Sequence, residues 1–189
     1  MTAVVWLAVF AVYLRGVAGS FYFEDSPELL AAAATLGNSH EPGTPPWLLV
    51  GRLALLLPAG GPAFRVNVAA AACAALAAVW LGSLAAAILR TWGRSDATAR
   101  WAGVFVTLVW GFSDTFWWQA GIGDKYPALY LGCVAVVWAA WKTTAEGGLR
   151  PLLGLALLLG LGLAHHPFVF FAVPAAACGV VSALPGERR

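Results

Sequence analysis

The sequence predicts an all-α membrane protein: a polytopic transmembrane bundle of about six spans, with short interfacial helices in its first outer loop. The first reason is composition. Of the 189 residues, 61% are hydrophobic and only 11% are charged, whereas soluble domains are about half apolar and about a quarter charged. The second reason is that several apolar runs approach the ~20 residues that a helix needs to cross a bilayer. No internal repeat divides the chain, so we interpret residues 1–189 as a single transmembrane domain.

Composition also excludes several classes of protein. A net charge of +2 is too small to indicate a nucleic-acid partner. The three cysteines, Cys73, Cys133 and Cys178, lie far apart in apolar runs. They therefore form neither a disulfide framework nor a set of metal ligands. The chain has no Walker loop and no GxSxG or CxxC motif, so nothing in it is suited to hold a nucleoside triphosphate.

The expected spans follow from the apolar runs. The first covers about Ala3 to Ala18, and we interpret it as a retained span because no basic region precedes it. The remaining runs are residues 66–89, 101–118, 126–141 and 151–185. The last run is long enough for two short helices, which we expect to meet at the turn His165-His166-Pro167.

The loop between the first two spans, residues 21–47, carries most of the polar chemistry. Ser26 and Pro27 predict a helix start, with Ser26 as the N-cap and proline in the first turn. Gly37 is expected to end this helix, and Thr44 is expected to begin a second one before Pro45. Both helices are too short to cross a bilayer, so we expect them to lie along its surface.

The basic residues predict the orientation. With the N-terminus inside, seven of the eleven Lys and Arg residues lie on the inner side, in agreement with the positive-inside rule. Six of the nine carboxylates and all three histidines then lie outside. The apolar runs 151–164 and 126–141 are also short against a core of ~30 Å. We therefore expect a recessed, polar, outward-opening cavity.

Three residues in the first outer loop are candidates for chemistry. Asp25 and Glu28 are spaced i, i+3, so one helical face can present both carboxylates. Paired acids suit general-base work or metal binding, and the alternative is that Glu28 only complements the helix dipole. His40 follows in a turn rich in proline and glycine, where it could shuttle protons, act as a ligand or simply face the interface.

The later polar residues give two more candidate groups. Asp124, Lys125 and Tyr126 begin a span, where an interfacial ion pair with an aromatic anchor is the alternative to a functional role. His165 and His166 interrupt a charge-free run, and ionisable groups inside a membrane are functional candidates by default. Their adjacent spacing is wrong for an i, i+4 metal pair, so we predict no metal ligands.

Taken in order, the polar motifs resemble one family. They are aromatic-Glu24-Asp25-Ser26-Pro27-Glu28, Leu36-Gly37, His40-x-Pro42-Gly43-Thr44-Pro45, Arg65-Val66-Asn67, Phe116-Trp117 with Asp124-Lys125-Tyr126-Pro127-Ala128-Leu129, and Gly160-Leu161-x-Leu163-x-His165-His166. Over about residues 21–174, this order resembles a large membrane family long catalogued as a domain of unknown function, which includes a eukaryotic transmembrane protein O-mannosyltransferase. That family is similar in turn to the GT-C glycosyltransferases, multi-span enzymes that take a sugar from a polyprenyl-phosphate carrier on the non-cytoplasmic side.

The resemblance implies roles for the candidate residues. Asp25 matches the acid that these enzymes use near the acceptor or as catalytic base, and Glu28 and His40 match further polar positions of the catalytic loop. The departing phosphate is then expected to be stabilised by Arg52, Lys125 or the pair His165 and His166. Asp124 and Tyr126 are further expected residues of the donor and substrate site. Glu41 departs from the pattern, because the family often has another proline there.

The resulting hypothesis is a membrane glycosyltransferase that transfers a sugar from a polyprenyl-phosphate-sugar donor to a hydroxyl of a protein or glycan acceptor. The sequence indicates no definite cofactor besides the polyprenyl-phosphate-linked sugar donor, and it leaves a requirement for a divalent metal open. The protein is expected in a bacterial inner (plasma) membrane with its active face outward. GT-C enzymes usually have more spans, so the chain is expected to be the N-terminal catalytic half of such a fold. The main alternative is a non-catalytic or truncated membrane subunit that binds a lipid carrier or a partner. A small proton-coupled transporter is a third alternative, against which the lack of an inverted repeat argues.

Overall fold

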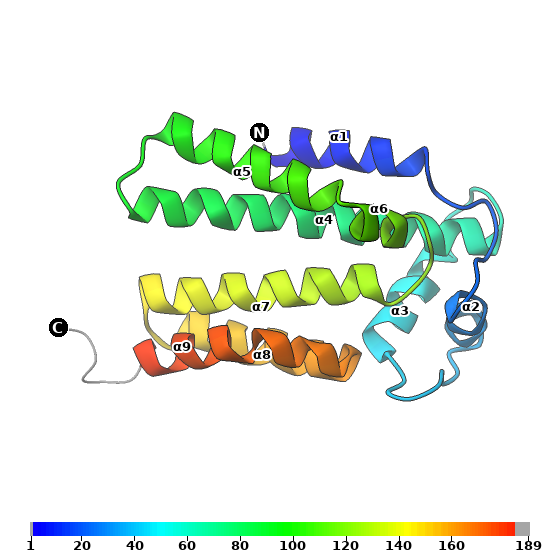
Figure 1. The fold of residues 1–189 in the computed structure, drawn as a ribbon. Helices are drawn as coiled ribbons and strands as arrows, with labels where there is room; N and C mark the ends of the chain where they lie inside the picture. Colours follow the sequence, from blue (N-terminus) through cyan, green and yellow to red (C-terminus); the bar gives the residue numbers. More distant parts are fainter. Residues whose placement is uncertain (1, 184–189) are drawn as a thin grey trace.

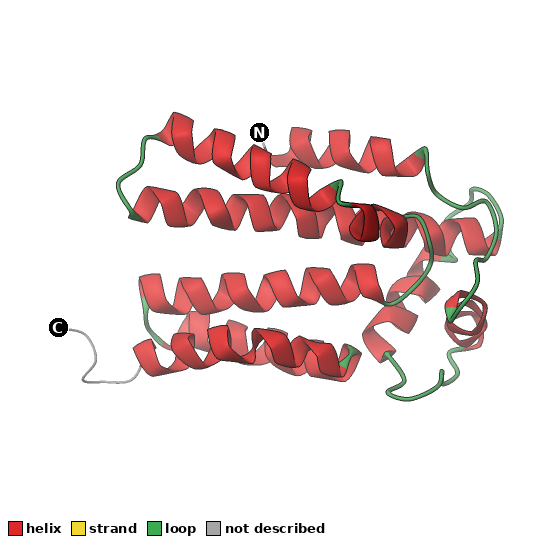
Figure 2. Ribbon diagram, viewed as in Figure 1, coloured by secondary structure: helices red, strands yellow, loops and turns green. Residues whose placement is uncertain are grey.

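The structure, a computed structural model, describes residues 2–183, and in this part of the chain it contains helices and loops without a strand (Figure 2). The predicted all-α class is confirmed. The helices are α1 Thr2–Leu14, α2 Ser26–Thr35, α3 Pro45–Ala54, α4 Pro62–Thr91, α5 Asp96–Gly111, α6 Asp114–Ala120, α7 Tyr126–Glu146, α8 Leu149–His165, the 3₁₀ helix η1 Pro167–Ala172, and α9 Val173–Ala183. The end of the last expected span, at Pro185, lies outside the described residues.

The longest helix, α4, lies at the centre of the bundle. It contacts α1 and α5 on one side and α7 on the other (Figure 1). Six of its alanines are fully buried: Ala70, Ala71, Ala74, Ala75, Ala77 and Ala78. Because alanine side chains are small, three neighbouring helices can approach the α4 backbone closely.

The second layer consists of α7, α8, η1 and α9. A core of apolar side chains joins them, including Val136 from α7, Leu155 from α8 and Val169 from η1. Helix α7 thus lies between α4 and the pair formed by α8 and α9. The loop end of this bundle is covered by α2 and α3, and α2 is seen nearly end-on in Figure 1 while the long helices run across the view.

Two described helices, α4 and α7, are long and apolar enough to cross a membrane by length and composition. The runs predicted as the other four spans correspond to α1, α5, α8 and η1 with α9. Of these, α1 has 13 residues, α5 has 16 and α8 has 17. Whether the shorter helices cross stays a prediction.

Three predicted boundaries are wrong. The first helix ends at Leu14 rather than near Ala18. The run 101–118 forms two helices, because α5 ends at Gly111 and Ser113 precedes a new helix start at Asp114. Helix α7 continues to Glu146, where an ion pair with Lys142 supports the last turn.

The length of α7 also corrects the argument for a recessed site. Its 21 residues span about 31 Å at 1.5 Å per residue, which is enough for the hydrocarbon core of a bilayer. A short helix is therefore not the reason why Lys125 is buried. The neighbouring loops cover it instead, as described below.

The crossing of α4 and α5 gives a test of the packing. A Cβ atom added to Gly82 would overlap the hydroxyl of Thr107 and the carbonyl oxygen of Gly103. We expect Gly82→Ala to lower the free energy of unfolding by about 1–3 kcal/mol, as overpacking usually does. The measurement is reversible denaturation of the purified protein in mild detergent. Gly132→Ala on α7 is the matched control, because that Cβ would meet open space, and a stability loss there of equal size would contradict this explanation.

Candidate functional site

Most of the charged side chains singled out in the sequence meet at one end of the bundle. Asp25 comes from the start of α2, His40 from the loop before α3, and Lys125 from the turn before α7. Lys125 Nζ pairs with Asp25, and His40 Nε2 lies 3.6 Å from Asp25 Oδ2. These segments converge although 100 residues separate Asp25 from Lys125.

The start of α2 differs from the prediction. Asp25, rather than Ser26, is the N-cap residue: its backbone is already in the right-handed helical region, with φ −81° and ψ −10°. Its carbonyl oxygen accepts a hydrogen bond from the Leu29 N–H at 2.9 Å. No side chain caps this helix, so the Asp25 carboxylate is left to face Lys125 and His40. The helix ends at Thr35, and the left-handed residue is Leu36 instead of Gly37.

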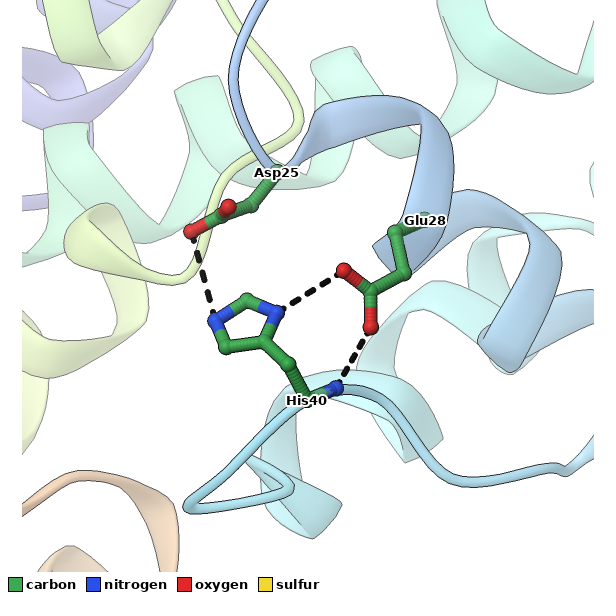
Figure 3. Close-up of side chains that lie close together, drawn as sticks. All are labelled: Asp25, Glu28 and His40. Carbon is green, nitrogen blue, oxygen red and sulfur yellow. Dashed lines mark hydrogen bonds and ion pairs between the residues drawn. The ribbon is translucent and has the colours of Figure 1, made fainter.

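Glu28 and His40 form the best-defined contact of the loop (Figure 3). The Glu28 carboxylate accepts a hydrogen bond from the His40 main-chain N–H at 2.5 Å, and its other oxygen lies 2.8 Å from His40 Nδ1. For this second bond, Nδ1 carries the proton, which leaves Nε2 facing Asp25. The side-chain bond and then the backbone bond from His40 hold the pKa of Glu28 below its ordinary value. Glu28 therefore fixes both the position and the tautomer of the imidazole.

Lys125 is the buried cation of the cluster, at 4% exposed. Its Nζ pairs with Asp25, lies 3.5 Å from Asp124 Oδ1 and stands 5.0 Å from the centroid of the Tyr126 ring. Asp124 is 1% exposed, and its carboxylate also accepts the Lys125 N–H at 2.5 Å. Burial lowers the pKa of Lys125, but the hydrogen bond to Asp25 and the charges of Asp124 and Asp25 outweigh it and raise the pKa above its ordinary value. The lysine is held as an ammonium ion.

The two histidines at the end of α8 have separate contacts. His165 Nε2 lies 3.0 Å from the carbonyl oxygen of Lys125, so this nitrogen donates the bond. His165 Nδ1 is buried without a hydrogen-bond partner among the described residues. His166 Nδ1 accepts the N–H of Phe168, and its ring centroid is 6.1 Å from that of Tyr126. The predicted turn at these residues is confirmed, and His165 links the end of α8 to the start of α7.

Arg52 is placed differently from the other candidates. From α3, its Nη1 donates a hydrogen bond to the carbonyl oxygen of Ala34 at 2.8 Å. The described contacts of Arg52 are therefore with the last turn of α2 and not with the charged cluster. Its expected role at the donor phosphate stays a prediction.

Asn67 is a positioning residue whose role was not predicted from the sequence. It is 1% exposed on α4, and its Nδ2 donates to the carbonyl oxygens of Ala18 at 2.7 Å and Ser20 at 2.9 Å. These bonds fasten the chain that leads into Asp25. The sequence does contain a signal for this role, an amide near the start of a charge-free apolar run. A buried amide needs hydrogen-bond partners, so Asn67 could have been expected to bind a neighbouring segment.

The cluster also has the geometry to hold a metal ion. Asp25, Glu28 and His40 each offer one ligand atom, and these atoms lie within 4.8 Å of one another. Two carboxylates and an imidazole are ordinary ligands for a divalent transition metal. A metal would compete with Lys125 for Asp25 and with His40 for Glu28. The sequence-based prediction of no metal ligands is untested.

A cavity of about 310 Å³ is lined by residues that flank Asp25 in the sequence. Its lining residues are Phe21, Tyr22, Phe23, Glu24 and Pro27. Phe23 is 80% exposed. The charged cluster thus has an apolar, aromatic neighbour on the surface.

These features define an all-α protein with apolar helices and a cluster of partly buried charges at one end. Residues 25–185 match the family model described as the N-terminal domain of protein O-mannosyl-transferase TMEM260. The match covers most of the chain and begins at Asp25, so the chain belongs to this family. The resemblance inferred from the motifs is confirmed. No solved structure matches the chain.

The Glu28–His40 contact predicts a pH-dependent loop. Because the pKa of Glu28 is lowered in the folded protein, its stabilising effect is present above the unfolded pKa and is lost as the pH falls through the folded value. Hydrogen exchange of the His40 amide should be slower in the wild type than in Glu28→Gln at pH 7, and this difference should shrink as the pH falls below the ordinary pKa of a glutamate. The Leu29 amide, bonded to the Asp25 carbonyl, is the internal control. Equal exchange of the His40 amide at pH 7 would contradict the contact.

Proposed function

We propose that this chain is a membrane-embedded glycosyltransferase domain that transfers a sugar from a polyprenyl-phosphate-sugar donor to an acceptor hydroxyl on the non-cytoplasmic face. Membership of an O-mannosyl-transferase family supports a glycosyltransferase role. The observation that carries the residue assignment is the convergence of Asp25, His40 and Lys125 from three segments of the chain.

Asp25 is the proposed general base. Its side chain is 34% exposed and contacts Lys125 and His40 through a single oxygen, Oδ2. The other oxygen has no hydrogen bond with the described residues, so an acceptor hydroxyl can reach it. In the proposed step, the hydroxyl proton passes to Asp25 while the hydroxyl oxygen bonds to the anomeric carbon. The bond from that carbon to the phosphate oxygen breaks, and polyprenyl phosphate leaves with the electron pair.

Lys125 is the proposed partner of the departing phosphate. An ammonium ion stabilises the charge that develops on the leaving oxygen. The same contact has a second consequence, because a phosphate that attracts Nζ weakens its pairing with Asp25. Asp25 would then be released from its ion pair when the donor is bound. Asp124 remains beside Lys125 and keeps the buried cation partnered in either arrangement.

Glu28 is proposed to hold His40 beside the base, and the imidazole attracts the Asp25 carboxylate when Nε2 carries a proton as well. The bond from Nδ1 to Glu28 directs Nε2 toward Asp25. Arg52, Tyr126, His165 and His166 complete the proposed donor side, with His165 fixing the backbone of Lys125. The donor lipid tail and a protein or glycan acceptor are the expected partners.

Exposed leucines support embedding of the shorter helices in the membrane. Leu153, Leu157 and Leu161 on α8 are all at least 50% exposed, and a spacing of four places them on one helical face. On α3, Leu49 and Leu53 are at least 60% exposed. We propose that α8 faces lipid along its length and that α3 lies in the interface, within a six-span bundle whose cluster faces outward.

The first test concerns Asp25. Asp25→Asn should remove most transfer from a polyprenyl-phosphate-sugar donor, since an amide cannot take the acceptor proton and losing a general base usually costs about 10²–10⁴-fold in rate. Glu28→Gln should reduce the rate less, because Glu28 acts through His40. Activity and melting temperature are measured together for the purified chain. Asp114→Asn, at the start of α6, is a matched control that should keep normal turnover.

The outcomes separate the competing functions. Near-normal turnover of Asp25→Asn beside an inactive Glu28→Gln would mean that the base is the other acid. No turnover from folded wild-type protein would favour the alternative, a membrane subunit that only binds a lipid carrier or a partner.

The second test concerns topology. Single cysteines at Glu41 and Ser95, both exposed, should label from opposite sides with an impermeant thiol reagent, in a background lacking Cys73, Cys133 and Cys178. Glu41→Cys is preferable to a cysteine at the neighbouring Ser39, which is only 7% exposed. Labelling of both positions from the same side would contradict the proposed orientation.

A further inference from the structure

A second cavity, of about 200 Å³, lies at the end of the bundle remote from Asp25. Its walls come from four helices, with Val5 of α1, Ala87 of α4, Val104 of α5 and Trp138 of α7 among the lining residues. It shares no residue with the charged cluster. Helix α4 separates the two places: Asn67 lies near its first turn, and the cavity adjoins its last turns.

The cavity has a cationic end. Arg90 and Arg100 both line it, one from the last turn of α4 and the other from the first turns of α5. Arg90 uses Nε to bind Asp96 at 2.8 Å, which leaves its two terminal nitrogens without a partner among the described residues. Arg100 makes no hydrogen bond or ion pair within the described part of the chain. The Asp96 carboxylate offsets part of this positive charge, through its bond to Arg90 and its proximity to Arg100. Both guanidinium groups still keep N–H donors for an anion, and guanidinium is well suited to phosphate.

The rest of the cavity is apolar with two hydroxyls. Ser83 and Thr107 donate to carbonyls of their own helices, and their oxygens remain able to accept. The volume is below the ~300–1,000 Å³ of pockets that enclose a whole small molecule. A small apolar cavity with two arginines at one end therefore fits part of a molecule that has an anionic group and an apolar chain.

We propose that this cavity binds an anionic phospholipid, with its phosphate between Arg90 and Arg100 and the first part of one acyl chain against Ala87 and Val104. Two exposed tryptophans at the same end support this choice. Trp92 is 71% exposed and Trp101 is 73% exposed. Tryptophan is enriched at the headgroup level of bilayers, where a lipid phosphate lies.

The test is native mass spectrometry of the detergent-purified chain with equal amounts of phosphatidylglycerol and phosphatidylcholine of the same acyl chains. The wild type should retain one phosphatidylglycerol in preference to phosphatidylcholine. The double variant Arg90→Gln/Arg100→Gln should weaken retention about tenfold or more, because each arginine near an anionic lipid contributes roughly fivefold. Arg94→Gln is the matched control, because Arg94 has the same charge and lies at the same end but does not line the cavity.

Further variants test the position of the acyl chain. Ala87→Leu should block retention of phosphatidylglycerol, whereas Ala85→Leu should not, since Ala85 is equally half-buried on α4 but outside the cavity lining. Arg90→Lys/Arg100→Lys should recover most retention, and unchanged melting temperatures show that the variants are folded. Soluble glycerol 3-phosphate should not displace the lipid.

Four results would overturn the proposal. Equal retention of the two lipids would exclude selectivity for an anion, and an equal loss in Arg94→Gln would indicate a diffuse positive field. Displacement by glycerol 3-phosphate would indicate a site for a free anion. A lipid-free dimer that Ala87→Leu abolishes would mean that a second copy of the chain covers the cavity.

Discussion

A lysine that is 4% exposed has to keep its charge partnered, and in this protein one partner is 100 residues away in sequence. The pairing of Lys125 with Asp25 joins the first loop to the start of α7. Asp124 is adjacent to Lys125 and adds a second carboxylate that is almost fully buried. Removing either partner of a buried ion pair is costly because a charge is left without solvent. The loops at this end therefore have to meet, and α2, the His40 turn and the end of α8 are arranged around that meeting.

The charges of the cluster do not balance. Asp25 and Asp124 pair with the one ammonium, whereas the third carboxylate, Glu28, contacts His40, which is positively charged only when it is protonated. Such an excess of acid is suited to taking a proton and is unfavourable for a phosphate. A phosphate donor can bind Lys125 only by replacing a carboxylate around it, and the partly exposed Asp25 is easier to displace than the buried Asp124. In the proposed reaction, donor binding would therefore release the proposed base from the same ammonium group.

The sequence predicted the helices better than their connections. Apolar runs and prolines located every long helix and the two short helices α2 and α3, because these signals are local, but they did not separate α6 from α5. The candidate site residues were chosen by their type, but most of their contacts were not predictable. The Glu28 bond to the His40 backbone, the Arg52 bond to the α2 carbonyl and the Asn67 bonds to Ala18 and Ser20 all depend on how segments meet in space. The break between α5 and α6 was predictable, since Ser113 before Asp114 is a normal helix start.

Helix α4 contributes residues to both ends of the bundle and separates the charged cluster from the second cavity. Asn67 fastens the chain before Asp25 at one end, and Arg90 borders the cavity at the other. These residues lie about 35 Å apart along the helix at 1.5 Å per residue, several times the Debye length of about 8 Å at physiological ionic strength. A lipid at Arg90 therefore cannot act on Asp25 by direct charge in the aqueous phase. A mechanical influence would have to pass through the packing of α4 against α1, α5 and α7, where buried alanines leave little room for the helices to shift.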